Sequence, residues 1–388
     1  MDPSGLAMPS APDARTSERR SHLAGRSGAR LAVSAAFTAA LVLAACGSSD
    51  RGTAPAGTAS TAAAQPIAGL QPGVWTWVDV PESACDDGSA TGMGVSLGTG
   101  PDLVVFLNGG GACWDYLTCY VLSTASRGPF GRPQFEALQA SALPGSFLDR
   151  DLAGNPFHDA SMVFVPYCTG DIHGGDNVAT YVGLEGPRVY HHVGHANLVA
   201  FLARVAAPWP SPRKLVVSGS SAGGFGALIN YDTFRSYWPA SRGYLIDDSG
   251  PPLEKGAVSQ ALLDAWYATW RLDEILDPVC GQACRTDLSA GLAAVERKYP
   301  QDRVALLSSL QDQVIAGYYQ IDGAQLESAL DALATNVIAP APSARFFFVS
   351  GNSHTMLGNP ASFAQGVSLL GWLQQQLSDD VAWTSQRP

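Results

Sequence analysis

One serine of the 388-residue chain lies in the motif that most specifically indicates a catalytic nucleophile. Ser221 lies in the segment 219–223, GSSAG, which fits the G-x-S-x-G pattern, follows an apolar run and precedes a helical stretch. Strand, sharp turn and helix in this order form a nucleophile elbow, and the flanking glycines allow the close backbone approach that the turn needs. Such a turn exposes the serine hydroxyl and aims the Ala222 N–H at a developing oxyanion. The context predicts a catalytic serine rather than a structural glycine-rich turn.

A glycine loop earlier in the chain offers further backbone donors for an oxyanion hole. The segment 108–114, NGGGACW, follows the apolar run 103–107 and resembles the HGGG-type loop of esterases. Glycine permits a backbone conformation that points N–H groups into the site. A phosphate-cradling loop is the alternative, which is weak because no GK[ST] follows and no helix clearly begins here.

The acid and the base of a triad are expected to follow the nucleophile in the order Ser, Asp, His. His354 comes right after the last apolar run, 346–349, and is the last of seven histidines. Asp312 lies just beyond the penultimate run, the usual place for the orienting acid, while Asp247 and Asp248 compete from the end of an earlier run. We predict that His354 is the general base and that Asp312 is the acid.

Two other polar clusters favour structural roles. His191 and His195 have the i, i+4 spacing of a metal chelate, but no acidic third ligand accompanies them at a fixed spacing. The segment 171–176, DIHGGD, is a candidate to line a cleft or to hold a loop, and we favour the structural role. We expect neither a metal ion nor a cofactor.

Apolar runs predict the elements that must position these residues. Short continuous runs alternate with helical stretches from about residue 100 onward, which indicates strands covered on both faces. This order predicts a three-layer α/β sandwich with a mostly parallel sheet, and residues 67–100 are expected to add antiparallel edge strands. The predicted strands are 103–107, 162–165, 215–217, 244–246, 304–307 and 346–349, and the predicted helices are 196–206, 222–235, 262–276, 288–298 and 361–377.

Residues 251–300 separate two predicted strands by more than a simple crossover needs. The segment contains Trp266, Tyr267 and Trp270. An insertion of this size between core strands is expected to form a helical cap over the active site.

The first 66 residues carry an export signal and a tether. Five arginines precede the apolar run 31–45, which is typical of a secretory signal and too short for a comfortable transmembrane helix. The run ends in LAACG, which looks like a bacterial lipobox, so Cys46 is the expected lipidation site and membrane anchor. Residues 47–66 lack large apolar side chains and are expected to form a flexible tether to a catalytic domain at 67–388. We expect an exported lipoprotein at the bacterial cell envelope or cell surface.

Composition limits the possible partners. Hydrophobic residues make up 46% of the chain and charged residues 15%, which allows a sizeable core. Residues 1–45 hold five arginines and three acidic residues, so without them 23 Lys+Arg and 34 Asp+Glu become 18 and 31, a net charge of −13. A protein this acidic is not expected to bind nucleic acid.

Six cysteines remain besides Cys46, and an even number in an exported protein predicts three disulfides. About fifteen pairings of six cysteines exist, and the sequence alone does not choose between them. Zinc binding is a weak alternative, because Cys280 and Cys284 have no second Cys or His pair nearby at zinc-finger spacing.

The ordered motifs between about residues 70 and 375 together resemble the pectin acetylesterase/Notum family, particularly its bacterial lipoprotein members. The resemblance implies an α/β-hydrolase fold, a Ser221–Asp312–His354 triad and an oxyanion hole from the N–H groups of Gly110, Gly111 and Ala222. It also suggests the disulfides Cys85–Cys168 and Cys113–Cys119, which leaves Cys280 for Cys284. The motifs are 85–89 (CDDGS), 108–114, 167–171 (YCTGD), 219–224, 247–250 (DDSG), 309–313 (SLQDQ) and 353–354 (SH).

We expect a serine carboxylic ester hydrolase with an acyl-enzyme mechanism. Carbohydrate O-deacetylation is the first expected reaction, and other small acyl or polyester esters come second. Two departures from the family bear on the substrate, since Asn108 replaces a Glu usual before the glycines and Gly111 replaces a Trp of the animal relatives. A non-catalytic surface-binding protein on a hydrolase scaffold, a peptidase and an acyltransferase are the alternatives from other classes, and the ordered triad disfavours the first of them.

Overall fold

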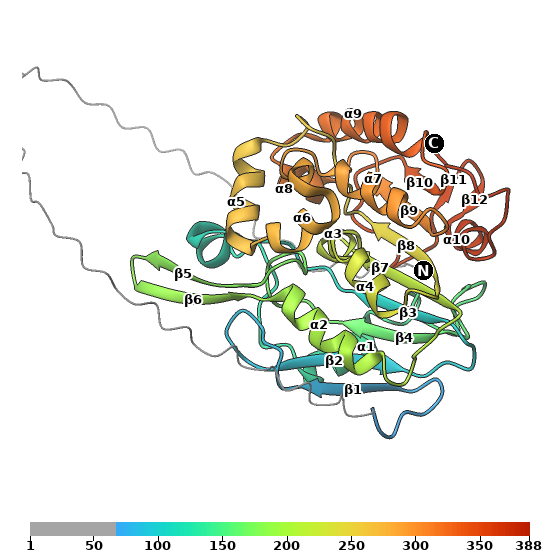
Figure 1. Ribbon diagram of the computed structural model, residues 1–388, viewed down its shortest axis with the longest axis horizontal. Helices are drawn as coiled ribbons and strands as arrows, with labels where there is room; N and C mark the ends of the chain where they lie inside the picture. Colours follow the sequence, from blue (N-terminus) through green and yellow to red (C-terminus); the bar gives the residue numbers. More distant parts are fainter. Residues whose placement is uncertain (1–66) are drawn as a thin grey trace, which may run out of the picture. The chain divides into compact units, whose positions relative to one another are not determined.

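The computed structural model describes residues 67–388, and residues 1–66 with Cys46, the expected signal and the expected tether lie outside this range. The described chain is built on one eight-stranded sheet in the order β1-β2-β4-β3-β7-β8-β9-β10 (Figure 1). No helix within residues 67–388 has the length and apolarity needed to cross a membrane. The eight strands are β1 Trp75–Val80, β2 Thr91–Ser96, β3 Leu103–Leu107, β4 Ser161–Val165, β7 Lys214–Ser220, β8 Arg242–Asp248, β9 Arg303–Ser309 and β10 Ala344–Val349.

The apolar runs of the sequence form the parallel part of this sheet. All six predicted strands are present, and β4, β3, β7, β8, β9 and β10 pair in parallel. β2 pairs antiparallel with both β1 and β4, so residues 67–100 add the expected antiparallel edge. The prediction of a mostly parallel α/β sheet is confirmed.

Alternate residues of the parallel strands pack into separate cores on the two faces of the sheet. In β3, Leu103, Val105 and Leu107 belong to one core, whereas Val104 and Phe106 belong to the other. Burial on both faces explains why the run is continuously apolar. Helices cover each core, which gives the three layers. The first core includes side chains of α2 Gly194–Val205, α3 Ala222–Ile229 and α9 Gly323–Leu333, and the second includes side chains of α1 Arg132–Ser141 and α10 Leu369–Leu377.

Two predicted helices are divided in the structure. The stretch 222–235 forms α3 and α4 Tyr231–Tyr237, because the Asn230 side-chain amide between them donates to the carbonyls of Gly226 and His173, at 2.9 Å each. Asparagine often interrupts helices by such competing bonds to the backbone. The stretch 262–276 similarly forms α5 Gln260–Trp270 and α6 Asp273–Cys280, separated at Arg271 with its left-handed φ of +56°.

The predicted helix 361–377 is wrong in its first half. A small hairpin of β11 Phe363–Ala364 and β12 Val367–Ser368 occupies that part, and its two turn residues, Gln365 and Gly366, both have positive φ. The helix α10 begins at Leu369, where the Ser368 side chain accepts a hydrogen bond from the Gly371 N–H. The helices predicted at 196–206 and 288–298 are confirmed as α2 and α7 Ser289–Lys298.

Between β8 and β9 the insertion is helical, with α5, α6 and α7 and a short 3-10 helix at Gly281–Arg285. The hairpin of β5 Asn177–Gly183 and β6 Gly186–His192 has no counterpart in the sequence prediction, and Figure 1 shows it extending away from the sheet. The helices α1, α8 Gln313–Tyr319 and α9 and the π-helical turns at Leu117–Val121 and Ala334–Ile338 also lay outside the prediction.

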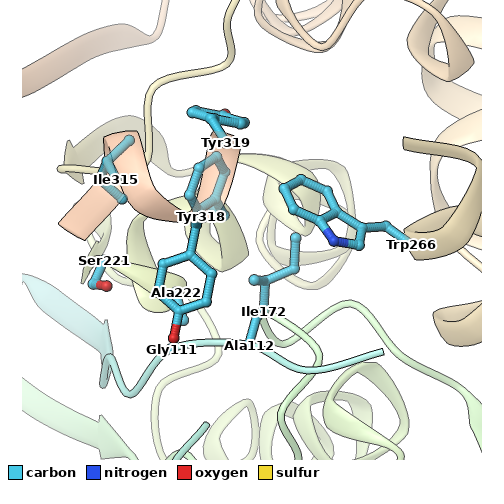
Figure 2. Close-up of a pocket in the computed structure, with 10 residues that line it drawn as sticks. Gly111, Ala112, Ile172, Ser221, Ala222, Trp266, Ile315, Tyr318 and Tyr319 are labelled. Carbon is cyan, nitrogen blue, oxygen red and sulfur yellow. The ribbon is translucent and has the colours of Figure 1, made fainter. Parts of the chain in front are cut away.

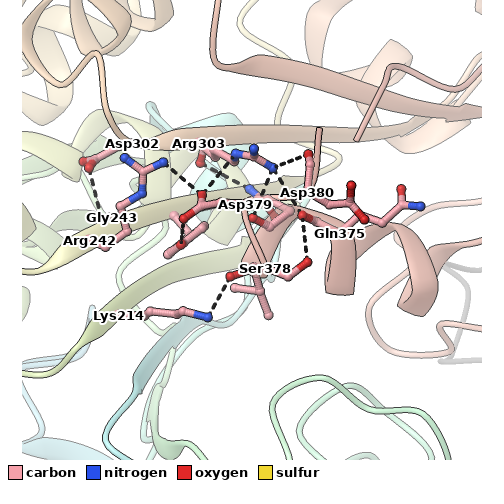
Figure 3. Close-up of polar contacts among 12 residues, drawn as sticks. Lys214, Arg242, Gly243, Asp302, Arg303, Gln375, Ser378, Asp379 and Asp380 are labelled. Atoms are coloured by element: carbon pink, nitrogen blue, oxygen red, sulfur yellow. Dashed lines mark hydrogen bonds and ion pairs between the residues drawn. The ribbon is translucent and has the colours of Figure 1, made fainter. Parts of the chain in front are cut away.

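Basic residues at the beginnings of β7 and β9 hold the end of α10 (Figure 3). Lys214 at the start of β7 donates to the Leu377 carbonyl at 2.7 Å. Arg303 at the start of β9 donates to the carbonyls of Gln375 and Asp380, at 3.2 and 3.1 Å. Cations at this place are attracted to the partial negative charge of the helix C-terminus and donate hydrogen bonds to its last carbonyl groups, which stabilises the helix end.

Candidate active site

Ser221 occupies a tight turn between β7 and α3. Its backbone φ is +60°, a left-handed conformation that residues other than glycine rarely adopt. Glycine is required on both sides, because a Cβ at Gly219 would lie 2.0 Å from the Gly223 carbonyl oxygen and a Cβ at Gly223 would lie 1.9 Å from that of Leu107. The turn therefore has the strand–turn–helix form predicted from the G-x-S-x-G pattern.

Asp312 and His354 come together at the ends of β9 and β10. The Nδ1 atom of His354 lies 2.8 Å from one carboxylate oxygen of Asp312, which has no exposed surface. The other oxygen accepts from the N–H groups of Val314 and Ile315, at 3.0 and 3.1 Å, and so caps α8. These bonds fix the carboxylate and direct one oxygen at the imidazole.

Asp248 is buried and contacts the backbone on both sides of the site instead of the imidazole. Its carboxylate accepts from the Ser220 hydroxyl at 2.7 Å and from the N–H groups of Met356 and Leu357 at 3.0 Å. Its own carbonyl accepts from the Ser221 N–H at 2.7 Å. Asp248 therefore ties the serine turn to the segment that directly follows His354.

Asp247 lies away from the imidazole as well. Its Oδ1 accepts from the Gly250 N–H at 2.8 Å, and within the described chain its Oδ2 has no hydrogen-bond partner. Burial raises the pKa of this carboxyl to about 8, and the nearby Asp248 adds to the effect. Neither of the competing aspartates contacts His354 through a hydrogen bond, whereas Asp312 does.

The glycine loop lies directly against the serine turn. A Cβ on Gly109 would lie 2.6 Å from the Ser220 carbonyl oxygen and 3.0 Å from the Ser221 Cβ. Gly111 has a φ of +76°, which favours glycine, and a Cβ there would lie 2.1 Å from the Thr124 carbonyl oxygen. Figure 2 shows Gly111 and Ala222 beside Ser221.

A small apolar cavity of about 20 Å³ opens beside Ser221 (Figure 2). The Tyr318 hydroxyl points toward Gly111 and donates to the Thr124 carbonyl. The contribution of α8 to this cavity was not predicted, although Ile315, Tyr318 and Tyr319 follow Asp312 on one helical face, at a spacing that helical periodicity could have revealed. The cavity is lined by Gly111, Ala112, Ile172, Ser221, Ala222, Phe225, Trp266, Ile315, Tyr318 and Tyr319.

A second apolar cavity, of about 40 Å³, lies between α3 and the insertion. It shares three walls with the first cavity, the side chains of Ile172, Phe225 and Trp266. Trp266 belongs to α5, so the helical insertion contributes directly to both cavities.

The structure contains three disulfides, Cys85–Cys168, Cys113–Cys119 and Cys280–Cys284. These are the pairs that the family resemblance suggested. The Cys113–Cys119 bond directly follows the glycine loop, and Cys85–Cys168 joins the segment after β1 to the segment after β4.

The histidines at 191–195 bond individually to the protein and do not converge. His191 Nδ1 lies 3.0 Å from the Asp86 carbonyl oxygen, and His195 Nδ1 lies 2.7 Å from the Asn230 side-chain oxygen. His192 lies close to Cys113 and Cys119, but these cysteines are joined in a disulfide and offer no thiolate ligand.

The sheet order, the serine turn and the buried acid–histidine pair define an α/β-hydrolase-like protein. A family model described as Pectinacetylesterase matches residues 75–290, and the chain belongs to this family. A crystal structure of the Wnt deacylase Notum from Drosophila has the same fold, with a TM-score of 0.59 and 19% identity over 80% of this chain and 96% of that one.

Curated relatives in animals match over shorter segments. The palmitoleoyl-protein carboxylesterase NOTUM of Schmidtea mediterranea is 28% identical over 39% of this chain and 28% of its own length. The palmitoleoyl-protein carboxylesterase notum1' of Xenopus laevis is 27% identical over 49% of this chain and 36% of its own length. The matches thus span only about a third of the length of these relatives.

Proposed function

We propose that the chain is a serine carboxylic ester hydrolase, with Ser221 as nucleophile, His354 as general base and Asp312 as orienting acid. The observation that carries the proposal is the 2.8 Å contact between His354 Nδ1 and the buried Asp312 carboxylate. A carboxylate on Nδ1 holds the imidazole in the tautomer whose Nε2 accepts a proton from a serine hydroxyl. The strained turn at Ser221 and membership of an esterase family support the same assignment.

Hydrolysis proceeds through two tetrahedral intermediates. His354 accepts the Ser221 hydroxyl proton while Oγ bonds to the ester carbonyl carbon, and the N–H groups of Gly110, Gly111 and Ala222 bind the oxyanion. Cleavage of the bond to the alcohol oxygen follows, and His354 protonates the departing alcohol. Water then gives a proton to His354 and attacks the acyl-enzyme, which releases the acid and returns the proton to Ser221.

Short acyl groups, acetyl on carbohydrate first among them, are the proposed substrates. The cavity beside Ser221 has a volume of about 20 Å³, room for about one water molecule, so a small acyl group suits it better than a long chain. The family description, Pectinacetylesterase, supports an O-acetyl ester.

A long acyl chain is the second candidate. The names of the animal relatives specify a palmitoleoyl group on protein, and the second apolar cavity supplies an inner chamber lined by side chains of α3 and the insertion. Because Ile172, Phe225 and Trp266 stand between the chambers, a long chain requires these side chains to move.

We also propose that the protein acts outside the cytoplasm, anchored through a lipid at Cys46. Three disulfides favour an oxidising compartment. The arginine-flanked apolar run and the LAACG segment support the anchor.

A panel of acyl esters from acetate to hexadecanoate, together with acetylated polysaccharide, tests the proposal. We expect hydrolysis to be fastest for acetate and to disappear in Ser221→Ala, with full activity in the control Ser236→Ala on an exposed face of α4. Preference for the longest chains would favour the second candidate. Undiminished hydrolysis by Ser221→Ala would contradict the mechanism.

A further inference from the structure

Three carbonyl oxygens of the glycine loop accept hydrogen bonds from the surrounding protein. Two of the donors are side chains, and both side chains come from the segment that follows β4. The contacts are Asn108 O with His173 Nε2 at 2.8 Å, Gly110 O with the Ser126 N–H at 2.6 Å, and Gly111 O with the Tyr167 hydroxyl at 2.8 Å.

These carbonyl contacts determine where the loop's N–H groups point. In a planar trans peptide, the C=O of one residue and the N–H of the next point in opposite directions. The Ser126 N–H on the Gly110 carbonyl therefore fixes the N–H of Gly111, one of the expected oxyanion donors. The side-chain donors on the Asn108 and Gly111 carbonyls fix the peptides that directly precede and follow the two peptides with the Gly110 and Gly111 N–H groups. Glycine lets such peptides rotate easily, and a rotated peptide would present a carbonyl oxygen to the oxyanion in place of a donor.

His173 donates to the loop as a neutral imidazole. A carbonyl oxygen only accepts, so the contact with Asn108 requires a proton on Nε2. Burial lowers the His173 pKa to about 4, which keeps the imidazole neutral near pH 7. The ring centroids of His173 and Tyr167 lie 4.7 Å apart, so the two donors also pack together.

Asp171 shapes the segment that carries both donors. Its buried carboxylate accepts from the Thr169 hydroxyl at 2.6 Å and from the N–H groups of His173 and Gly194 at 3.1 and 2.7 Å. Ile172 and His173 both adopt positive φ, +52° and +59°, a strained conformation that persists only where surrounding contacts impose it. The Ile172 N–H donates to the Tyr167 oxygen at 2.8 Å, which orients the Tyr167 proton toward Gly111.

We infer that Tyr167 and His173 are positioning residues: they fix the peptides on either side of the Gly110 and Gly111 N–H groups, and so keep these groups directed at the oxyanion that forms on Ser221. The inference rests on the proposed esterase function. Neither side chain lines the cavity beside Ser221, so both act through the loop backbone and not on the substrate. Their removal is therefore expected to weaken transition-state binding more than substrate binding.

Tyr167→Phe tests the hydroxyl with almost no change in shape, and Tyr190→Phe is its matched control. Tyr190 is also buried, but within the described chain its hydroxyl has no hydrogen-bond partner. Loss of a complete oxyanion donor lowers kcat by roughly 10²–10³, and a misplaced donor is expected to cost about 10–100-fold. We expect this loss in kcat for Tyr167→Phe with KM within about twofold, and unchanged kinetics for Tyr190→Phe.

His173→Gln and His173→Leu separate donation from packing. An amide N–H in His173→Gln can replace the Nε2–H, whereas His173→Leu has no donor. We expect kcat to fall in His173→Leu and to recover at least partly in His173→Gln. The rate of phosphonylation of Ser221 by a fluorophosphonate is expected to follow kcat, while thermal midpoints of the two variants need not differ.

The full-length protein and Ser221→Ala are measured in the same experiment, so that two kinds of failure are distinguishable. Absence of Ser221-dependent hydrolysis in the wild type overturns the proposed function and the inference with it. Hydrolysis by the wild type, with equal kcat in Tyr167→Phe and Tyr190→Phe or in His173→Gln and His173→Leu, overturns the inference alone.

Discussion

The candidate aspartates Asp312 and Asp248 differ in what they contact, and those contacts indicate their roles. Asp312 divides its oxygens between the N-terminus of α8 and the imidazole of His354. Asp248 uses its carboxylate to join the serine turn to the segment after His354. The first arrangement orients a base, and the second stabilises the backbone around it.

Asp312→Asn is expected to lower kcat by about 10⁴, because an amide does not hold the histidine tautomer and does not stabilise an imidazolium. Asp248→Asn leaves the Asp312–His354 pair in place, so its main effect is expected on the free energy of unfolding. Steady-state kinetics and urea unfolding of both variants provide the check. A large kinetic loss confined to Asp248→Asn would show that the acid is misassigned.

The raised pKa of Asp247 predicts that the free energy of unfolding depends on pH. An aspartate ionises near pH 4 in the unfolded chain, whereas burial raises its folded-state pKa to about 8. Between these values the folded protein holds one more proton, so this group makes the free energy of unfolding decrease as pH rises, by up to about 1.4 kcal/mol per pH unit. Asp247→Asn removes this contribution, and its unfolding free energy is expected to fall less between pH 5 and 7.5. Parallel curves for Asp247→Asn and the exposed control Asp151→Asn would contradict the prediction.

The triad and the glycine loop could be predicted from the sequence, whereas the residues that support the loop could not. Ser221, the glycine loop and His354 stand in local patterns tied to strand ends, which single-sequence reasoning detects. Asp312 was preferred to Asp248 as the acid only because of its position after the penultimate strand. The hydrogen bonds that distinguish the two aspartates join residues 42 and 108 positions apart, which the sequence does not reveal. Tyr167 and His173 lay in motifs without an assigned chemical role, since their contact with the glycine loop exists only in the folded chain.

At the scale of elements, the first residues of β7 and β9 secure α10. Arg303 reaches the carbonyls at the end of this helix, and α10 covers the second core of the sheet. Such bonds between a cation and helix-end carbonyls stabilise more than exposed ion pairs do.

Arg303→Met keeps the apolar stem and removes the guanidinium. We expect the free energy of unfolding to decrease by about 1–3 kcal/mol, because partly buried carbonyl groups lose a charged donor. Arg188→Met breaks an exposed pair with Glu185 and is expected to change stability little. Equal losses in the two variants, measured by urea unfolding, would contradict the anchoring role.

Strands were predictable because burial on both faces leaves a continuous apolar run, as in β3 and β8. Helix boundaries depended on single side chains with distant partners, such as Asn230, which bonds to the carbonyl of His173. The hairpin β5–β6 was missed for a different reason. Its exposed face includes Val178, Val182 and Val189, so apolar residues face outward and the usual alternation gives no clue.

At the scale of the whole molecule, the candidate site gathers loops that follow β3, β7, β9 and β10, where the carboxyl ends of parallel strands meet. Two disulfides crosslink the chain at this edge, and they enclose chain segments of very different length. Cys113–Cys119 closes a loop with a separation of 6 residues, and Cys85–Cys168 spans 83 residues.

Removal of the long-range bond is expected to destabilise the protein more. Loop-closure entropy gives about 4–5 kcal/mol for a span like Cys85–Cys168 and about 2 kcal/mol for one like Cys113–Cys119. The double variant Cys113→Ser/Cys119→Ser is instead expected to lower kcat, since its loop directly follows the oxyanion glycines. Urea unfolding and ester hydrolysis of this variant and of Cys85→Ser/Cys168→Ser test these two expectations, and equal losses of stability would contradict them.

The most direct test of the central claim is to locate the covalent adduct of a fluorophosphonate by peptide mass spectrometry. We predict one adduct per molecule, on Ser221, with labelling strongly slowed in His354→Ala and absent in Ser221→Ala. Labelling of another residue, or undiminished labelling of Ser221→Ala, would contradict the assignment of Ser221 as the nucleophile of a serine esterase.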